Sequence, residues 1–426
     1  MAQSKVDLGS GTRLADYLSI SLLSRVFPAR QVHQALDAHG CNSQRIRRFP
    51  AVAGAYYAMA LSLYPDAAYE SVFSAVAEGL AWGAGASVPR PVAKSSISEL
   101  RTRIGAAPLR DLMRCCCLPL AQPESLPQAF FHGLRVVAID GSRLELPDER
   151  AVVAEFGRPG SRTGHAGYPQ AQCVVLAECA THAILAGEIG PYRGDEWELC
   201  RWLLGALEPD MLCLADRGFN GIEQWQQALA TGAQLLWRAS DNRHLPVKQT
   251  LADGSYLSEL PPPKPKAGRS KLAASVVRVI EYRLPGLPDA KARYRLITSL
   301  LDPAKAPALE LARLYHRRWD IEAVFDELKT HLRQGRRVLR SKTVDLIKQE
   351  FFGWVLAHYA VRWLMHQGAQ RSGQADEDLS FTAHVQLLKR ELPRSGAFPP
   401  RAPQKTTARL AGRSAGQRAT ALRAHA

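Results

Sequence analysis

The pattern of apolar and polar residues changes once along the chain, near residue 130. Between residues 13 and 120, apolar residues recur at spacings of three and four, as in RLADYLSISLLSRVF, and Gly or Pro separates the segments. This spacing predicts amphipathic helices. From about Leu134, short apolar runs of the kind that form buried strands alternate with helical segments. An all-helical region is therefore predicted to precede an α/β domain.

The α/β pattern predicts a mixed sheet with helices on its faces. Predicted strands cover residues 134–139, 172–179, 183–189, 211–215 and 233–240, and predicted helices cover 196–207 and 221–230. Only three residues separate the second and third strands, so these two are expected to form a hairpin. The order of strand, strand pair, helix, strand, helix and strand suits a mixed α/β sheet with helices on its faces.

Two segments of the helical region favour a helix-turn-helix pair. Ser96 and Glu99 have the spacing of a capping box, Gly105 can end the first helix, and Pro108 opens the second. Such pairs bind DNA, but they also occur in plain helical bundles, and the spacing alone leaves both interpretations open.

Residues 238–295 differ in composition from their surroundings and indicate an inserted β element. They combine a loop rich in Pro and Lys with β-branched segments, and they hold twelve basic and five acidic residues, a net charge of +7. A long helix is predicted from about Pro307 to Arg333, and another covers 351–365. Beyond Leu392 the chain has seven basic residues and no acidic one, so a disordered basic tail is expected.

The whole chain is strongly basic. Its 426 residues carry a net charge of +15, and 46% of them are hydrophobic, which excludes disorder throughout. This charge favours an anionic partner, either nucleic acid or a membrane surface, although a spread of solvated Arg explains such a charge equally well. The longest uncharged stretch, residues 49–65, is too short to span a membrane and predicts a buried helix. Without an apolar leader or a CxxC pair, the chain is expected to be cytoplasmic, with reduced cysteines and no membrane contact.

Two acidic residues follow predicted strands. Asp140 comes after the strand in VVAIDGS and Asp216 after the strand in LCLADRGF, each with a glycine within two residues. Ligands of α/β sheets commonly bind at the carboxyl ends of strands, although an acidic residue at such a place also often caps a turn.

The helix predicted over 315–333 carries a polar stripe at the border of its apolar face. At 100° per residue, Tyr315, Arg318, Glu322 and Lys329 lie within about 60° of one another. Asp326 lies on the same face as Glu322, but Glu322 is closer to the apolar border and is therefore the favoured third carboxylate. An ordinary solvated helix face remains the alternative interpretation.

Three carboxylates from separate segments suit metal-dependent phosphodiester chemistry. Magnesium prefers oxygen ligands and keeps positions for water or phosphate. A pair of such ions activates the attacking oxygen and stabilises the leaving oxygen, so no Ser, Cys or His nucleophile is needed.

The segment YHRRWDIEAVFDELK matches the Y-(2)-R-(3)-E-(6)-K signature of DDE transposases of the insertion-element-four group. IDGSRLELP and LADRGF resemble the segments around the first and second catalytic Asp of that group. The three motifs occur in the family's order, and the resemblance covers about residues 85–370.

The resemblance implies a domain organisation. Residues 126–370 would form an RNase H-like catalytic domain, interrupted by the β-rich insertion at 238–295. Residues 1–125 would form a helical DNA-binding region, and 371–426 a carboxyl-terminal segment with the basic tail.

It also implies cut-and-paste transposition of an insertion sequence, with cleavage at transposon ends and strand transfer into target DNA. Asp140, Asp216 and Glu322 would hold Mg²⁺, for which Mn²⁺ would substitute. Tyr315, Arg318 and Lys329 would contact the phosphates of the DNA end. The partners implied are the terminal inverted repeats, the target DNA and a second copy of the chain.

One feature departs from the family pattern. Members that form hairpins stack a flipped base on a Trp of the β insertion, but residues 238–295 contain no Trp. Trp237, just before this segment, is expected to pack in the core. A DNA-binding repressor derived from a transposase and a structure-selective nuclease with the same metal site are the two alternative functions.

Overall fold

The computed structural model describes residues 23–44, 49–74, 76, 92–160, 167–219, 221–261, 273–283, 294–332, 337–372, 379–382 and 384–385. The chain divides into two compact units. The first comprises Met1–Leu120, Arg143–Ala171 and Phe325–Ala426, and the second comprises Ala121–Ser142 and Gln172–Val324. Each unit is therefore built from segments that are distant in the sequence.

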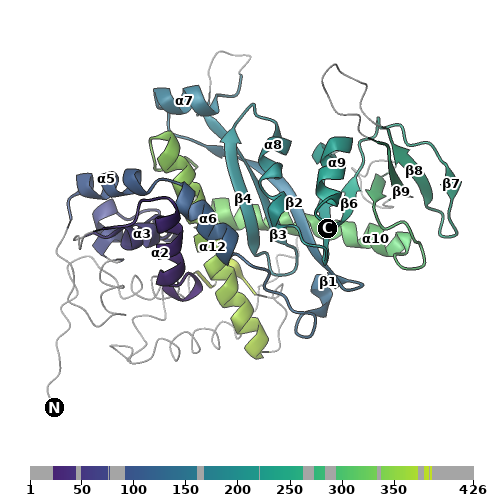
Figure 1. Cartoon of the computed structure of the whole chain (residues 1–426), viewed down its shortest axis with the longest axis horizontal. Helices are drawn as coiled ribbons and strands as arrows, with labels where there is room; N and C mark the ends of the chain where they lie inside the picture. The colour runs from purple at the N-terminus through teal and green to yellow at the C-terminus, as the bar shows by residue number, and fades with distance from the viewer. Residues whose placement is uncertain are drawn as a thin grey trace. The chain divides into compact units, whose positions relative to one another are not determined.

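A single mixed sheet organises the strands (Figure 1). In order of pairing, its strands are β4 (Ile184–Pro191), β3 (Gln170–Glu178), β2 (Leu134–Glu145), β5 (Met211–Ala215), β6 (Gln234–Arg238), β10 (Tyr294–Thr298), β9 (Ser275–Tyr282), β8 (Tyr256–Leu260) and β7 (Gln249–Thr250), with β1 (Phe130–Phe131) paired to β2. The predicted hairpin is present as β3 and β4, and β2, β5 and β6 run parallel.

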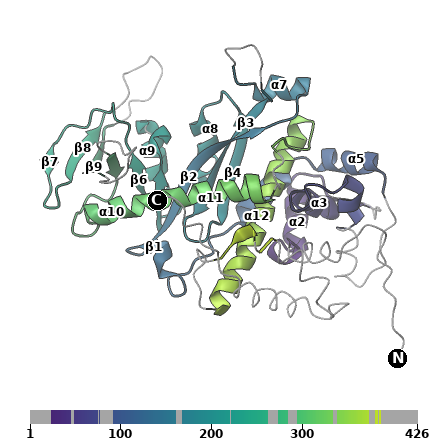
Figure 2. The same cartoon turned by 180° about the vertical axis from the view of Figure 1, so that it is seen from behind.

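Helices cover both faces of this sheet. The two views place α8 (Glu196–Arg201) and α9 (Ile222–Leu229) on one face and α11 (Asp320–Asp326) on the other (Figures 1 and 2). An edge hairpin, a central strand and two parallel strands, with helices on both sides, form the RNase H-like α/β fold that the sequence predicts.

The β-rich insertion extends this same sheet. β10 pairs antiparallel with β6, β9 with β10, and β8 with β9. The fully buried Arg278 of β9 binds the carboxylate of Asp253 and donates to the carbonyl oxygen of Ala306 at 2.6 Å. The hydroxyl of Ser255 accepts a further bond from Arg278 at 2.8 Å. One buried guanidinium thus joins the insertion to the segment that enters the next helix.

The prediction of one continuous α-helix from Pro307 to Arg333 is wrong, because this segment contains four consecutive helical elements of three types. α10 (Ala308–Tyr315) is followed by a 3₁₀ turn (His316–Trp319), by α11 and by a π-helix (Glu327–Leu332). A 3₁₀ turn rotates each residue by more than 100° and a π-helix by less, so helical-wheel angles do not hold across these junctions. Most of the predicted apolar face is nevertheless buried: Ile321, Val324, Phe325, Leu328 and Leu332.

The first unit contains the amino-terminal helices α2 (Ala29–Ala38), α3 (Ala51–Leu63), α5 (Lys94–Ile104) and α6 (Ala107–Cys116), together with α7 (Arg150–Phe156) and α12 (Val344–Ser372). α3 and α12 pack side by side (Figure 2). A Cβ on Gly353 of α12 would lie 2.5 Å from the carbonyl oxygen of Ala58 in α3, so only glycine permits this approach. The uncharged stretch at 49–65 is thus a buried helix, as predicted.

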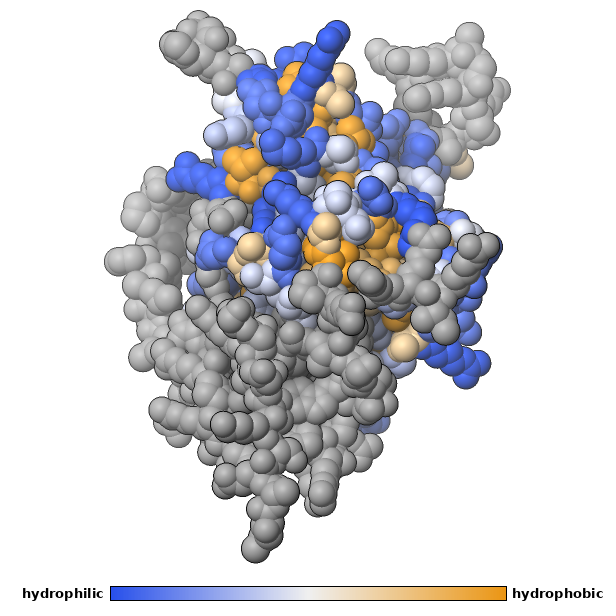
Figure 3. Space-filling view, turned by 90° about the vertical axis from the view of Figure 1, so that its left-hand side faces the viewer, coloured by the Kyte–Doolittle hydropathy of each residue, from blue (hydrophilic) through white to orange (hydrophobic). Residues whose placement is uncertain are grey.

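The predicted helix pair is present as α5 and α6, with Gly105 at φ +68° between them. The predicted capping box is wrong. α5 begins at Lys94, and no side chain caps it, because Lys94 and Ser95 extend the helix upstream of Ser96. Figure 3 shows the side of the molecule on which α5 lies in Figure 1, where hydrophilic side chains of the described residues surround separate hydrophobic patches.

Two smaller expectations change. The helix predicted over 196–207 ends at Arg201 and is followed by a 3₁₀ turn (Leu204–Ala206). All eight cysteines are free, but Cys115 is exposed and Cys116 partly so, because the end of α6 leaves them at the surface. The other six are buried, and Trp237 is 1% exposed, as expected.

No helix among the described residues has the length and apolarity needed to cross a bilayer. The basic tail beyond Leu392 lies outside the described residues.

Candidate active site

The register of two parallel strands brings the first two carboxylates together. β2 and β5 pair from Arg135 with Met211 to Ile139 with Ala215, so Asp140 and Asp216 are the next residues on neighbouring strands. The prediction that β2 ends before Asp140 is wrong, since β2 continues to Glu145. Asp140 still lies at the end of the parallel pair, because it is the first residue beyond the segment of β2 that pairs with β5.

Arg318 connects Asp140 to Glu322. Its Nη1 lies 3.1 Å from Oδ2 of Asp140, and its Nη2 lies 3.6 Å from Oε1 of Glu322. The Arg318 side chain is 7% exposed, whereas that of Glu322 is 52% exposed. The 3₁₀ turn that carries Arg318 therefore points this cation into the site, and α11 leaves Glu322 at its open side.

Two further side chains support Asp216. The Tyr315 hydroxyl donates to the carbonyl oxygen of Ala215 at 3.2 Å, and its ring is buried. Nη1 of Arg238, at the end of β6, lies 3.9 Å from Oδ1 of Asp216. Tyr315 thus packs beneath the end of β5, in a place that the sequence pattern did not indicate.

The carboxylates influence one another. Burial raises the pKa of Asp140, and the nearby Asp216 adds to this, whereas the Gly141 N–H and Arg318 act to lower it. Burial also raises the pKa of Glu322, Arg318 opposes this, and Asp140 and Asp216 add to the rise. Acidic groups that share a site have this effect when their charge is not fully compensated.

An open cavity of about 520 Å³ adjoins Asp216. It is lined by Asp216, Arg217, Gly218, Ser240, Asp241 and Asn242. Arg295 of β10 holds its far wall, because Nη2 donates to the carbonyl oxygens of Ser240 at 2.6 Å and Asp241 at 2.7 Å. The insertion thus fixes the loop opposite Asp216.

Two candidate site residues from the sequence, Lys329 and Asp326, belong to the first unit. Nζ of Lys329, in the π-helix, lies 5.6 Å from the centre of the Phe325 ring. Oδ2 of Asp326, the alternative third carboxylate, lies 3.1 Å from Nε2 of His331. In the second unit, the motif also contains Trp319, which is 55% exposed beside Arg318 and lies outside residues 238–295, where the stacking aromatic residue of the family was expected.

Comparison with known families identifies the chain. A family model for the transposase DDE domain matches residues 131–360. This chain belongs to the insertion element 4 family of DDE transposases. The model for the insertion element 4 transposase N-terminal region matches residues 17–114 of the DDE transposase. The resemblance inferred from the three motifs is thereby confirmed.

One curated relative and one solved structure are similar to this chain. The transposase InsG for insertion sequence element IS4 of Escherichia coli (strain K12) is 28% identical over 319 residues, which is 74% of this DDE transposase and 71% of InsG. A structure of the piggyBac transposase synaptic complex with hairpin DNA matches with a TM-score of 0.44 and 12% identity, over 92% of this chain and 85% of that chain.

DDE transposases act on DNA and generally use a divalent metal, and the donor atoms of the site fit such an ion. Carboxylate oxygens are its preferred ligands, and Oδ1 of Asp216 is buried without a hydrogen bond. Within the described residues, no three acidic, His or Cys side chains converge closely enough to hold a metal as they stand. Arg318 instead pairs with Asp140 and Glu322 in this DDE transposase.

Proposed function

We propose that this transposase performs cut-and-paste transposition, with metal-dependent cleavage at transposon ends followed by strand transfer into target DNA. The observation that supports this most directly is that a strand register and a shared arginine link three carboxylates within one unit. Adjacent parallel strands carry Asp140 and Asp216, and Arg318 joins Asp140 to Glu322. An RNase H-like domain at 126–370, a helical DNA-binding region at 1–125 and a segment at 371–426 form the proposed organisation.

Asp140, Asp216 and Glu322 would hold Mg²⁺, or Mn²⁺ in its place. Bound there, the metal supplies an activated attacking oxygen and stabilises the leaving oxygen of the phosphodiester. The chain's own residues provide the positions: the strand register fixes Asp140 beside Asp216, and Tyr315 holds the backbone that precedes Asp216.

Arg318 has two roles in this proposal. Before DNA binds, its guanidinium compensates Asp140 and Glu322. With a divalent cation compensating these carboxylates, Arg318 would turn to the phosphates of the transposon end, which a planar guanidinium binds with two parallel hydrogen bonds. Lys329 adds a second cation. Tyr315, first expected to reach a phosphate, contributes from beneath the site.

The proposed partners are the inverted repeats at the transposon ends, the target DNA and a second copy of the chain. Both ends must be held together for one element to be moved, so a homodimer on paired ends is the smallest assembly that provides two sites.

The variants Asp140→Asn, Asp216→Asn and Glu322→Gln test this proposal, because each keeps the side-chain shape and removes one metal-binding charge. Cleavage of end DNA with Mg²⁺ is expected to fall by at least about 1000-fold, consistent with removal of a group that stabilises the transition state. DNA binding, measured by mobility shift, is expected to stay within a few-fold.

Asp326→Asn is the matched control, because Asp326 lies one helical turn beyond Glu322 and its side chain is 58% exposed. It should cleave like the wild type, and its inactivity together with an active Glu322→Gln would transfer the role to Asp326. DNA binding by the wild type without cleavage under any divalent metal would support a repressor instead. Cleavage without products joined to target DNA would support a nuclease.

A further inference from the structure

A fourth carboxylate lies against the backbone of both aspartate motifs. Oε1 of Glu196, in the first turn of α8, occupies the space that a Cβ on Gly141 would need. Its other oxygen, Oε2, lies 3.7 Å from the place of a Cβ on Gly218. Gly141 directly follows Asp140, and Gly218 is two residues beyond Asp216. Glycine at Gly141 has a negative φ, so its purpose is space and not conformational freedom.

The start of α8 is fixed in place by packing. Asp195 accepts a hydrogen bond from the Trp197 N–H at 2.9 Å and thereby caps the helix. The Trp197 ring is buried, and its centre lies 6.3 Å from the centre of the Trp237 ring. Nε1 of Trp197 donates a hydrogen bond to Oε1 of Gln227 at 3.1 Å. Glu196 therefore extends from a rigid base, and its carboxylate is positioned by the core of the second unit.

This position brings two carboxylate oxygens to the end of the strands where Asp140 and Asp216 lie, and carboxylate oxygens are the ligands that Mg²⁺ and Mn²⁺ prefer. Asp216 Oδ1 is already buried without a hydrogen bond. We propose that Glu196 is a fourth carboxylate of the metal centre and binds the divalent cation together with Asp140 and Asp216. This inference rests on the proposed function, because it assigns one more ligand to the same site.

A role for Glu196 in filling space or bonding to the backbone is the competing explanation, and Glu196→Gln separates the two. Glutamine keeps the size of the side chain and one acceptor oxygen, and it removes the charge. In Glu196→Gln, the binding of Mn²⁺ to the full chain is expected to weaken roughly 10- to 100-fold. Electron paramagnetic resonance measures this binding through the loss of the free-ion signal. The melting temperature without metal should stay at the wild-type value.

Glu198→Gln is the matched control, since Glu198 is an exposed residue of the same short helix and should bind Mn²⁺ like the wild type. Asp216→Asn serves as the reference for loss of binding. Wild-type binding by Glu196→Gln beside weakened binding by Asp216→Asn would overturn the role of Glu196 and leave the proposed function standing. Wild-type binding by both variants, and by Asp140→Asn, would overturn the metal site itself.

Gly141→Ala provides an independent variant. The added Cβ would displace the Glu196 carboxylate, so Mn²⁺ binding should weaken as in Glu196→Gln. Both substitutions remove the same interaction. The double variant Gly141→Ala/Glu196→Gln should therefore bind Mn²⁺ with the same affinity as whichever single variant binds it less tightly. Additive losses would show that Gly141 acts separately, and would overturn this explanation of the glycine.

Discussion

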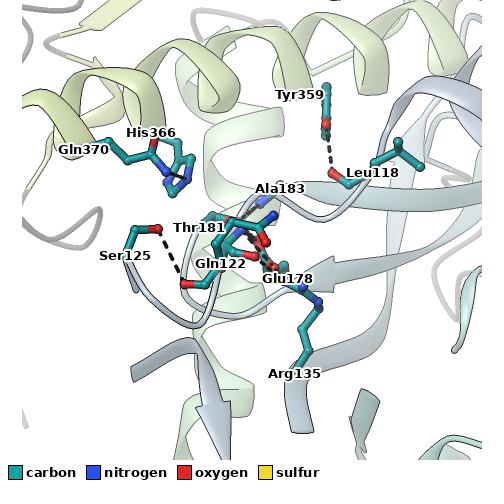
Figure 4. A network of polar contacts seen from close by, with 11 residues as sticks. Leu118, Gln122, Ser125, Arg135, Glu178, Thr181, Ala183, Tyr359, His366 and Gln370 are labelled. Atoms are coloured by element: carbon teal, nitrogen blue, oxygen red, sulfur yellow. Dashed lines mark hydrogen bonds and ion pairs between the residues drawn. The ribbon is translucent and has the colours of Figure 1, made fainter. Parts of the chain in front are cut away.

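Two buried arginines of the second unit have different electrostatic surroundings. Arg135 donates to Oε1 of Glu178 at 2.5 Å and to the carbonyl oxygen of Ala121 at 2.7 Å (Figure 4). Glu178 also accepts from the Ala121 N–H at 3.1 Å and from the Thr181 hydroxyl at 2.5 Å. Several donors thus surround one buried carboxylate, as a structural ion pair requires. Arg318, by contrast, forms ion pairs with two carboxylates of the candidate active site, Asp140 and Glu322.

Replacing Arg318 with Met tests whether the guanidinium competes with metal. Without it, Asp140 and Glu322 lose their counter-ion, so the metal-free protein should melt at a lower temperature and bind Mn²⁺ several-fold more tightly. Cleavage should still be lost, because Arg318 is also proposed to bind phosphate. Thermal unfolding measures the change in melting temperature, and electron paramagnetic resonance measures Mn²⁺ binding.

The exposed Arg313 of α10 provides the control, and Arg313→Met should match the wild type in all three measurements. Weaker Mn²⁺ binding by Arg318→Met would mean that the arginine arranges the carboxylates for the metal instead of occupying their place.

At the scale of elements, the π-helix that follows α11 carries a second polar cluster, inside the first unit. Glu327 is 6% exposed and accepts hydrogen bonds from Arg362 and from Nε2 of the fully buried His358, both on α12, the latter at 2.9 Å. Burial lowers the pKa of His358 to about 3. Nδ1 of His358 is buried without a partner, which suits a neutral ring whose only proton is on Nε2.

This neutral histidine predicts acid sensitivity of the first unit. Below pH 6.5 the unfolded chain takes up a proton at this position that the folded chain does not, down to about pH 3. The free energy of unfolding should therefore fall as the pH drops through 6.5, by up to about 1.4 kcal/mol per pH unit for this single group. Urea unfolding between pH 7.5 and 5 measures the slope.

His358→Gln keeps a hydrogen-bond donor toward Glu327 and cannot titrate, so its slope should be smaller than that of the wild type by this amount. His33→Gln, at an exposed histidine of α2, should keep the wild-type slope. Equal slopes for His358→Gln and the wild type would show that His358 is not the responsible group.

At the scale of the whole molecule, the charge of +15 is concentrated in two segments. Residues 238–295 and the residues beyond Leu392 carry a net +7 each, so the rest of the chain is nearly neutral. A core that gathers acidic residues for a metal repels DNA, and basic segments elsewhere in the chain offset this repulsion.

Deleting residues 393–426 should make DNA binding less dependent on salt. Each phosphate contact contributes about 0.9 to the slope of log K against log salt concentration, so the slope should become shallower by up to about 6 if all seven basic residues bind phosphate. Fluorescence anisotropy with duplex DNA at several salt concentrations measures it. A full-length variant with the seven residues replaced by Gln should match the deletion, and an unchanged slope in both would show that the tail does not contact DNA.

The sequence by itself determined the order and type of most elements, because apolar periodicity reflects which side of a strand or helix is buried. It also determined the family, since the segments around Asp140 and Asp216, their order, and the residue spacing of the motif around Glu322 are visible without coordinates. It did not determine helix regularity: the 3₁₀ turn and the π-helix of the motif result from packing and carry no separate signal in residue spacing.

Only the tertiary structure decided which groups meet. The register of β2 and β5 places Asp140 beside Asp216, residues 76 positions apart, and the pairing of Arg318 with Asp140 spans 178 positions. Glu196 carries no motif that would single it out, and its relation to Gly141 and Gly218 appears only when α8 packs on the sheet. Sequence periodicity is local, whereas the chemistry of this site depends on contacts made across the whole fold.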